Sequence, residues 1–185
     1  ALLRQGVNLT VLLDSVEQAE AVAAASQQDV TIPALIELDC DGHRSGVHCD
    51  DREQLLAIAH TLNATGNLRG VLTHAGESYT AINREALVAA AENERASAVR
   101  AAEILRHAGH GCPVVSIGST PTALFAENYD GITEVRAGVF AFFDLVQAGL
   151  GVCSPQDIAV SVLATVIGHQ HEKGWTIIDA GWAAL

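Results

Sequence analysis

LIELDCDGHRSGVH, residues 35–48, begins as an apolar strand and then turns abruptly polar, with two carboxylates, an imidazole and a guanidinium. Glycines at positions 42 and 46 flank the guanidinium of Arg44. In parallel α/β folds the functional site forms where the carboxyl ends of the strands meet. The stretch therefore predicts a buried parallel strand that ends in a functional loop.

The same order of strand and helix repeats along the chain. Apolar strands are expected at residues 8–14, 33–39, 68–74 and 113–120, with a fifth strand region at 131–144 that Gly138 splits. Helices are expected at residues 15–26, 50–66, 83–107 and 120–127. Ser15 and Gln18 form a capping-box pattern at the first of these helices. Strands rich in Val, Ile and Leu that alternate with helices predict a parallel sheet covered by helices.

The pattern changes near residues 151–157. Residues 158–170 and 175–181 predict an antiparallel hairpin, with the turn HEKG between them. We therefore expect a β-rich element to begin there.

Composition restricts the function classes. A net charge of −12 over 185 residues, without a basic run, argues against a nucleic-acid surface. We find no membrane-spanning stretch and no signal peptide, so a soluble, cytoplasmic protein is expected. The four cysteines are widely spaced without a CxxC pair, which favours free thiols over a disulfide framework.

Polar side chains follow the predicted strands. Asp14 ends the first, Arg44 follows the second and His74 the third. Arg44 is expected to bind an anionic or planar partner, or else to form a structural ion pair with Asp39 or Asp41. Taken alone, His74 is better explained as a half-buried histidine hydrogen-bonded to a neighbour than as a functional residue.

The segment SIGSTPT, residues 116–122, follows the fourth strand. A glycine turn with hydroxyls at the start of a helix suits a phosphate, and it equally suits a simple helix cap. Arg136 and Gly138 follow in the fifth strand region. His169 and His171 form an HxH pattern, but no further ligands complete a metal site, so a solvated turn is the preferred interpretation.

Several segments together resemble a known family. LDCDGHRSGV resembles the Asp-x-Gly-x-x-Arg-x-Gly segment of the alanine racemase N-terminal barrel, found in fold-type III pyridoxal-phosphate (PLP) enzymes. GVLTHAGESY is similar to the next strand of that superfamily. VSIGSTPT, TEVRAGVFAFFD and VIGHQHEKGWTIIDAGWAAL resemble the D-threonine aldolase and D-serine dehydratase-like branch. The resemblance implies a partial (β/α)8 TIM-type barrel over residues 1–152, followed by the beginning of a C-terminal β domain over 153–185.

The resemblance also implies contacts with the PLP ring. Arg44 would lie near the phenolic oxygen, and His74 would stack against the pyridine ring. Tyr79 matches the residue that approaches the ring nitrogen in the D-serine dehydratase-like branch. Arg136 matches the arginine that alanine racemase places there, so the partner of the ring nitrogen stays open between these two.

For the phosphate, the resemblance implies Gly118, Ser119 and Thr120, with Gly138 and the amide of Val139 adding to them. The branch usually carries a polar residue and a Tyr after the glycine of the fifth strand region. Here Val139 and Phe140 follow it, so only the backbone of this loop is expected to contribute.

One essential residue of the family has no counterpart. These enzymes need a Schiff-base lysine on the first barrel strand, and the single lysine, Lys173, lies in the HEKG turn instead. The lysine strand would precede residue 1, and the metal-binding His/Cys pair of the β domain would follow Leu185. A divalent metal (Zn, Mn or Mg) is therefore expected from residues outside this chain.

The function implied is that of a PLP-dependent lyase acting on a small D-amino acid, by retro-aldol cleavage or by β-elimination through a carbanion. A PLP-dependent amino-acid racemase of the same fold is one alternative. A non-catalytic PLP or phosphate-binding α/β module is another. We expect a homodimer for the full-length enzyme.

Overall fold

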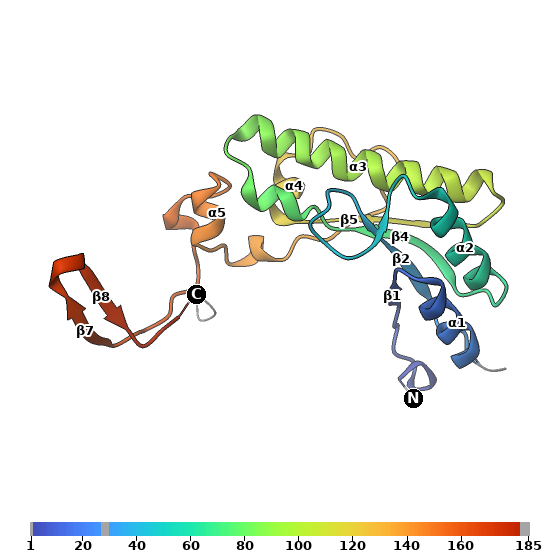
Figure 1. Ribbon diagram of the computed structural model, residues 1–185, viewed down its shortest axis with the longest axis horizontal. Helices are drawn as coiled ribbons and strands as arrows, with labels where there is room; N and C mark the ends of the chain where they lie inside the picture. The colour runs from blue at the N-terminus through green and yellow to red at the C-terminus, as the bar shows by residue number, and fades with distance from the viewer. Residues whose placement is uncertain (1, 27–29, 182–185) are drawn as a thin grey trace. The chain divides into compact units, whose positions relative to one another are not determined.

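The computed structural model describes residues 2–26 and 30–181. The chain forms two compact units, residues 1–138 and 139–185, and each is described by itself. The first contains a parallel sheet with helices, and the second contains a short helix and a two-stranded hairpin (Figure 1). This division follows packing alone, so the domain limits 1–152 and 153–185 stay a prediction.

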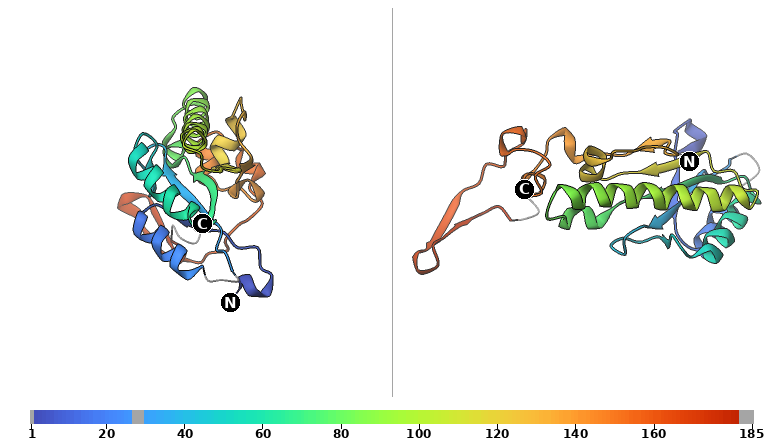
Figure 2. Two further views of the ribbon diagram at one scale, coloured as in Figure 1. Left: turned by 90° about the vertical axis from the view of Figure 1, so that its right-hand side faces the viewer. Right: turned by 90° about the horizontal axis from the view of Figure 1, so that it is seen from above.

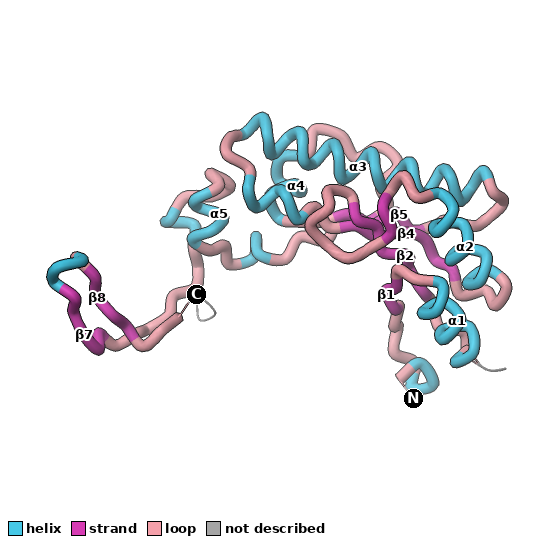
Figure 3. The backbone as a smooth tube through the Cα atoms, viewed as in Figure 1, coloured by secondary structure: helices cyan, strands magenta, loops and turns pink. Residues whose placement is uncertain are grey.

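A parallel sheet organises the first unit. Its main path runs in chain order through β1 (Val11–Leu13), β2 (Ala34–Asp39), β4 (Leu68–Thr73), β5 (Val114–Ile117) and β6 (Glu134–Val135). All of these neighbours pair in parallel, and their strands lie side by side in Figure 3. The α/β class with parallel strands is confirmed, and the unpermuted strand order is that of a segment of a β/α barrel.

Helices connect the strands. They are α1 (Val16–Ala25), α2 (Arg52–Asn63), α3 (Arg84–His107) and α4 (Thr120–Phe125), with the 3-10 helices η1 (Leu3–Gln5) and η2 (Gly76–Thr80). The side chains of Ser15, Asp51, Asn83 and Ser119 cap the four α-helices by accepting a backbone N–H.

The capping box expected at α1 is formed only in part. Ser15 accepts the amide of Gln18 at 3.2 Å, as predicted. The side chain of Gln18, however, accepts the amide of Asp14 at 2.8 Å instead of returning to Ser15. The Gln18 side chain thus bonds the amide of Asp14, which lies one residue before the N-cap Ser15.

The helices cover one face of the sheet (Figure 2). Ile36, Leu38, Val71, Val115 and Ile117 pack in one buried cluster with apolar residues of α2 and α3. Successive side chains of a strand point to opposite faces, so Glu37 and Ser116 belong to the other face. The face away from the helices therefore carries these two polar residues beside the apolar Leu35.

A short strand explains the glycines around Arg44. β3 (Val47–His48) pairs in parallel with the end of β2, so residues 40–46 form a loop whose two ends touch. Gly46 has φ +134°, and a Cβ there would lie 2.5 Å from the carbonyl carbon of Leu38. The close return of the chain therefore requires glycine at this position.

The fifth strand region is shorter than predicted. Only Glu134–Val135 forms a strand, and η3 (Val139–Ala141) is a 3-10 helix. The amides of Phe142 and Phe143 both donate to the carbonyl oxygen of Val139, at 3.1 and 2.7 Å. Phe143 also has φ +55°, so the apolar run after Gly138 is a tight turn that cannot pair as a strand.

The second unit contains the predicted hairpin. β7 (Val166–Gln170) and β8 (Trp175–Ile178) pair antiparallel, joined by η5 (His171–Lys173). The helices α5 (Leu145–Gly149) and η4 (Pro155–Asp157) precede it. The hairpin is confirmed, but its first strand begins at Val166 and not at residue 158, because residues 158–165 form no ladder.

Gly70 gives a direct test of the pairing of β4 with β5. It has φ +146°, and a Cβ there would lie 1.9 Å from the carbonyl oxygen of Val114. We expect Gly70→Ala to lower the free energy of unfolding, measured by urea denaturation, by about 3 kcal/mol or more, because backbone must move.

Gly109→Ala is the matched control. Gly109 also has a positive φ, +84°, but a Cβ there meets nothing within 4 Å. This variant is expected to lose only about 1 kcal/mol. Equal losses in the two variants would contradict the close approach of the two strands.

Candidate functional site

The predicted site residues of the first unit lie at the carboxyl ends of the strands. Arg44 lies in the loop after β2, and His74 follows β4 directly. Gly118 follows β5, and Arg136 follows β6. Parallel pairing brings these ends to one edge of the sheet, as expected from the sequence.

His74 is an electrically neutral aromatic surface at this edge. Its ring stacks on that of Tyr79 in η2, with centroids 6.0 Å apart and 16° between the planes. Burial, reinforced by the nearby Arg44 guanidinium, lowers the pKa of His74 below its ordinary value. Its Nε2 atom is buried and has no hydrogen-bond partner among the described residues. The structure thus leaves this polar atom unused at the carboxyl end of β4.

Arg136 is held from within the sheet. Its Nε donates to the hydroxyl of Ser116 at 2.9 Å, and its Nη2 donates to the carbonyl oxygen of Thr73. Glu134 lies 3.9 Å away as an ion-pair partner. Burial lowers the pKa of Arg136, but the guanidinium stays charged because its ordinary pKa is so high. The result is a fixed positive charge on the polar face of the sheet.

Arg44 is exposed and, within the described ranges, forms no ion pair with Asp39 or Asp41. The alternative of a structural ion pair between Arg44 and Asp39 or Asp41 is therefore wrong. Asp39 instead accepts the amide of Gly42 at 2.7 Å, and Asp41 accepts the amide of Glu77 at 2.8 Å. The carboxylates fix the backbone of the loop and leave the side chain of Arg44 to another partner.

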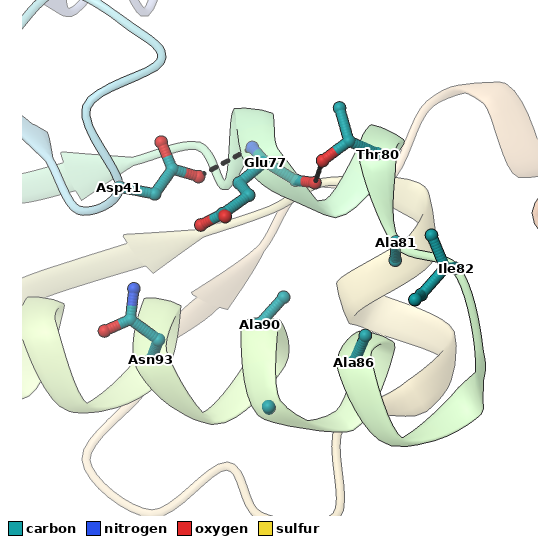
Figure 4. Close-up of a pocket in the computed structure, with 9 residues that line it drawn as sticks. Asp41, Glu77, Thr80, Ala81, Ile82, Ala86, Ala90 and Asn93 are labelled. Atoms are coloured by element: carbon teal, nitrogen blue, oxygen red, sulfur yellow. Dashed lines mark hydrogen bonds between the residues drawn. The ribbon is translucent and has the colours of Figure 1, made fainter.

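A groove of about 530 Å³ lies beside Asp41, between η2 and the first turns of α3 (Figure 4). Asp41, His43 and Glu77 place possible metal-ligand atoms within 4.8 Å of one another. The oxygens of Asp41 already accept the amides of His43 and Glu77, and Nδ1 of His43 lies 3.0 Å from the carbonyl oxygen of Asp41. These hydrogen bonds account for the closeness of the three side chains, because they hold the loop after β2 against η2.

The segment after β5 forms a helix cap. Ser119 accepts the amide of Thr122, and Thr122 accepts the amide of Ser119, which completes a capping box at α4. Ser119, Thr120 and Thr122 are at most 2% exposed. The simple alternative of a helix cap is confirmed, and phosphate binding by Ser119 and Thr120 stays a prediction.

Gly118 allows the backbone after β5 to approach the backbone of Arg136 closely. It has φ +157°, and a Cβ there would lie 2.0 Å from the carbonyl oxygen of Arg136. Its N–H donates to the side chain of Glu94 at 3.0 Å, so a phosphate cannot take that hydrogen while the bond lasts. Gly138 ends the first unit and Val139 begins the second, and their predicted contact with phosphate stays a prediction.

Glu94 was not predicted from the sequence. Its side chain is completely buried in the middle of α3, and it accepts hydrogen bonds from Ala75, Gly118 and Thr122. A signal was present, because Glu94 falls at helical spacing between Ala91 and Ala98 on the apolar stripe of α3. A carboxylate on a buried stripe indicates an internal polar partner.

The histidines and cysteines outside this edge have plainer roles. His169 and His171 stack on each other, with centroids 5.7 Å apart, on the exposed hairpin. All four cysteines are free, as predicted. Burial raises the pKa of Cys40 to about 12, so this residue is an unreactive thiol at neutral pH.

Residues 1–146 match the family described as alanine racemase, N-terminal domain. The chain belongs to this family, and the resemblance to fold-type III PLP enzymes is confirmed. Among the described residues, no helix combines the length and the apolar character needed to cross a membrane.

The chain is 59% identical to D-threo-3-hydroxyaspartate dehydratase from Delftia sp. (strain HT23), over 98% of this chain and 48% of that protein. A solved structure of that dehydratase superposes with a TM-score of 0.89, over the same shares of the two chains. Identity is 27% to D-serine dehydratase from Dictyostelium discoideum, over 96% of this chain and 48% of that protein. The chain is 26% identical to 3-hydroxy-D-aspartate aldolase from Paracoccus denitrificans (strain Pd 1222), over 98% of this chain and 49% of that protein. The chain thus spans about half the length of each of these relatives.

The electrostatic contact between Arg44 and His74 can be measured. Because Arg44 disfavours the imidazolium, we expect Arg44→Gln to raise the pKa of His74 toward its ordinary value. An NMR titration of histidine Cε1–H resonances, with His74 assigned from a His74→Gln variant, gives this pKa directly. Arg52→Gln, an exposed change in α2, should leave it unchanged. An unchanged or lower pKa in Arg44→Gln would show that the two side chains do not face each other.

Proposed function

We propose that the protein is a PLP-dependent lyase that eliminates water from 3-hydroxy D-amino acids. One observation carries the proposal. The carboxyl ends of parallel strands bring together the Arg44 and Arg136 guanidinium groups with the neutral imidazole of His74. Such a set suits an anionic, planar, aromatic group of the kind that fold-type III enzymes use.

The side chains present fit PLP. An aromatic ring needs a flat neighbour, and His74 offers one whose buried Nε2 has no partner among the described residues. An anion needs donors without competing carboxylates, and Arg44 forms no ion pair within the described ranges. Because Gly118 donates to Glu94, the phosphate is proposed to rely on Ser119, Thr120, Gly138 and Val139.

The proposed roles follow the chemistry of each side chain. Arg44 would donate to the phenolic oxygen of PLP, and His74 would pack on the ring. Arg136 is favoured over Tyr79 at the ring nitrogen, since Ser116 and Thr73 fix its guanidinium. A guanidinium donates a hydrogen bond but does not give up its proton, so it leaves the ring nitrogen unprotonated. PLP, when bound, supplies an electron sink for the substrate's α-carbon.

The relatives support elimination over cleavage. The proteins at 59% and 27% identity are dehydratases, whereas the aldolase is 26% identical. The proposal includes the lysine expected before residue 1, a divalent metal bound beyond Leu185, a homodimer and a cytoplasmic location. A metal on the substrate hydroxyl would make that group a better leaving group.

Turnover by the full-length protein tests this function. With PLP and a divalent metal, we expect the D isomers of threo-3-hydroxyaspartate and serine to give oxaloacetate and pyruvate, with ammonia. Glycine with glyoxylate from hydroxyaspartate would indicate retro-aldol cleavage instead, and formation of the L isomer would indicate racemisation. The proposal fails if no product forms and no PLP binds.

Arg136→Lys tests the proposed partner of the ring nitrogen. Lysine keeps the charge but loses the planar fork that bonds both Ser116 and Thr73, so we expect kcat to fall about 10-fold or more. Arg69→Lys, on an exposed position of β4, is the control and should keep its kcat. Equal activity in the two variants would remove Arg136 from the site.

A further inference from the structure

Glu94 is the one glutamate whose side chain is wholly buried among the described residues. Carboxylates are seldom fully buried unless they are paired or hydrogen-bonded. Burial raises the pKa of Glu94, while its hydrogen bonds and the Arg136 charge act against that rise. Because burying a carboxylate costs desolvation free energy, we expect Glu94 to have a specific role in the protein.

The hydrogen bonds of Glu94 join two loops of the predicted cofactor site. Oε1 accepts the amide of Ala75 at 2.9 Å and the amide of Gly118 at 3.0 Å. Oε2 accepts the hydroxyl of Thr122 at 2.7 Å. Ala75 follows His74, and Gly118 precedes Ser119, so a single carboxylate oxygen ties the ends of β4 and β5 together.

Hydroxyl groups extend this contact. The hydroxyl of Ser78 donates to the carbonyl oxygen of Ala75 at 2.7 Å and lies 3.0 Å from that of Ser119. The hydroxyl of Ser119 lies 2.9 Å from that of Thr122. All of these side chains are buried, so their positions are set by one another and not by solvent.

We infer that Glu94 is a positioning residue for the cofactor site. It fixes the peptides next to His74 and Ser119 relative to each other, and through them the ring contact and the turn proposed to hold the phosphate. This inference rests on the proposed function. Glu94 itself needs no contact with PLP, because its oxygens are already occupied by Ala75, Gly118 and Thr122.

The chemistry of the three donors defines the informative variants. Glu94→Gln keeps one carbonyl oxygen, which can still accept both amides, while its NH₂ faces a Thr122 hydroxyl that can turn toward Ser119. Glu94→Met has a similar length and accepts no such bonds, so both amides lose their partner. Glu103→Met, on the exposed side of the same helix, is the matched control.

The experiment is a PLP titration of the full-length apoprotein at 25 °C, followed by absorbance and equilibrium dialysis, with folding checked by circular dichroism. We expect Glu94→Met to raise the PLP Kd about 10-fold or more, and Glu94→Gln to stay within about threefold of the unmodified protein. Glu103→Met should bind as the unmodified protein does. A folded Glu94→Met variant with an unchanged Kd would overturn the inference, because it would leave Glu94 a purely structural role.

Two further outcomes are distinguishable. If Glu94→Met does not fold, Glu94→Asp decides by the same titration, since it keeps the carboxylate but is one methylene too short to reach Ala75, Gly118 and Thr122 together. A Kd raised about threefold supports the inference, and an unchanged Kd overturns it. If the unmodified protein binds no PLP, the proposed function fails first, and the role of Glu94 falls with it.

Discussion

The parallel pairing of β2, β4 and β5 is the constraint on which the rest of the molecule depends. Parallel strands must be joined by crossovers, and the crossovers place α1, α2 and α3 on one face. Ile36, Leu38 and Val71 pack on that face against the helices. The opposite face carries Glu37 beside Leu35, and the carboxyl ends carry His74 and Arg136.

The charges at this edge form a consistent set. Arg136 is bonded to a hydroxyl and a carbonyl of the sheet, and the lowered pKa of His74 keeps its imidazole neutral between guanidinium groups. Asp39 and Asp41 are turned to backbone amides, whereas Glu134 lies 3.9 Å from Arg136 as its ion-pair partner. Within the described ranges the Arg44 guanidinium forms no ion pair and therefore remains available to an anionic ligand, which is the electrostatic condition for a phosphate-bearing cofactor.

The sequence predicted what depends on local pattern. The strands at Ala34–Asp39 and Leu68–Thr73, and the cap of α1 by Ser15, follow from apolar runs and a single capping residue. Other features depend on how the backbone turns. The run after Gly138 is as apolar as a strand, but the carbonyl of Val139 accepts two amides and closes a turn. Glu94 lay hidden because its partners come from residues 19 and more positions away along the chain.

A crystal structure of the full-length protein with PLP tests the central claim most directly. We predict the cofactor at the carboxyl ends of β2, β4, β5 and β6, against His74 and within reach of Arg44 and Arg136. Glu94 should still accept the amides of Ala75 and Gly118. PLP bound elsewhere, or these strand ends closed on one another with no room for it, would contradict the account.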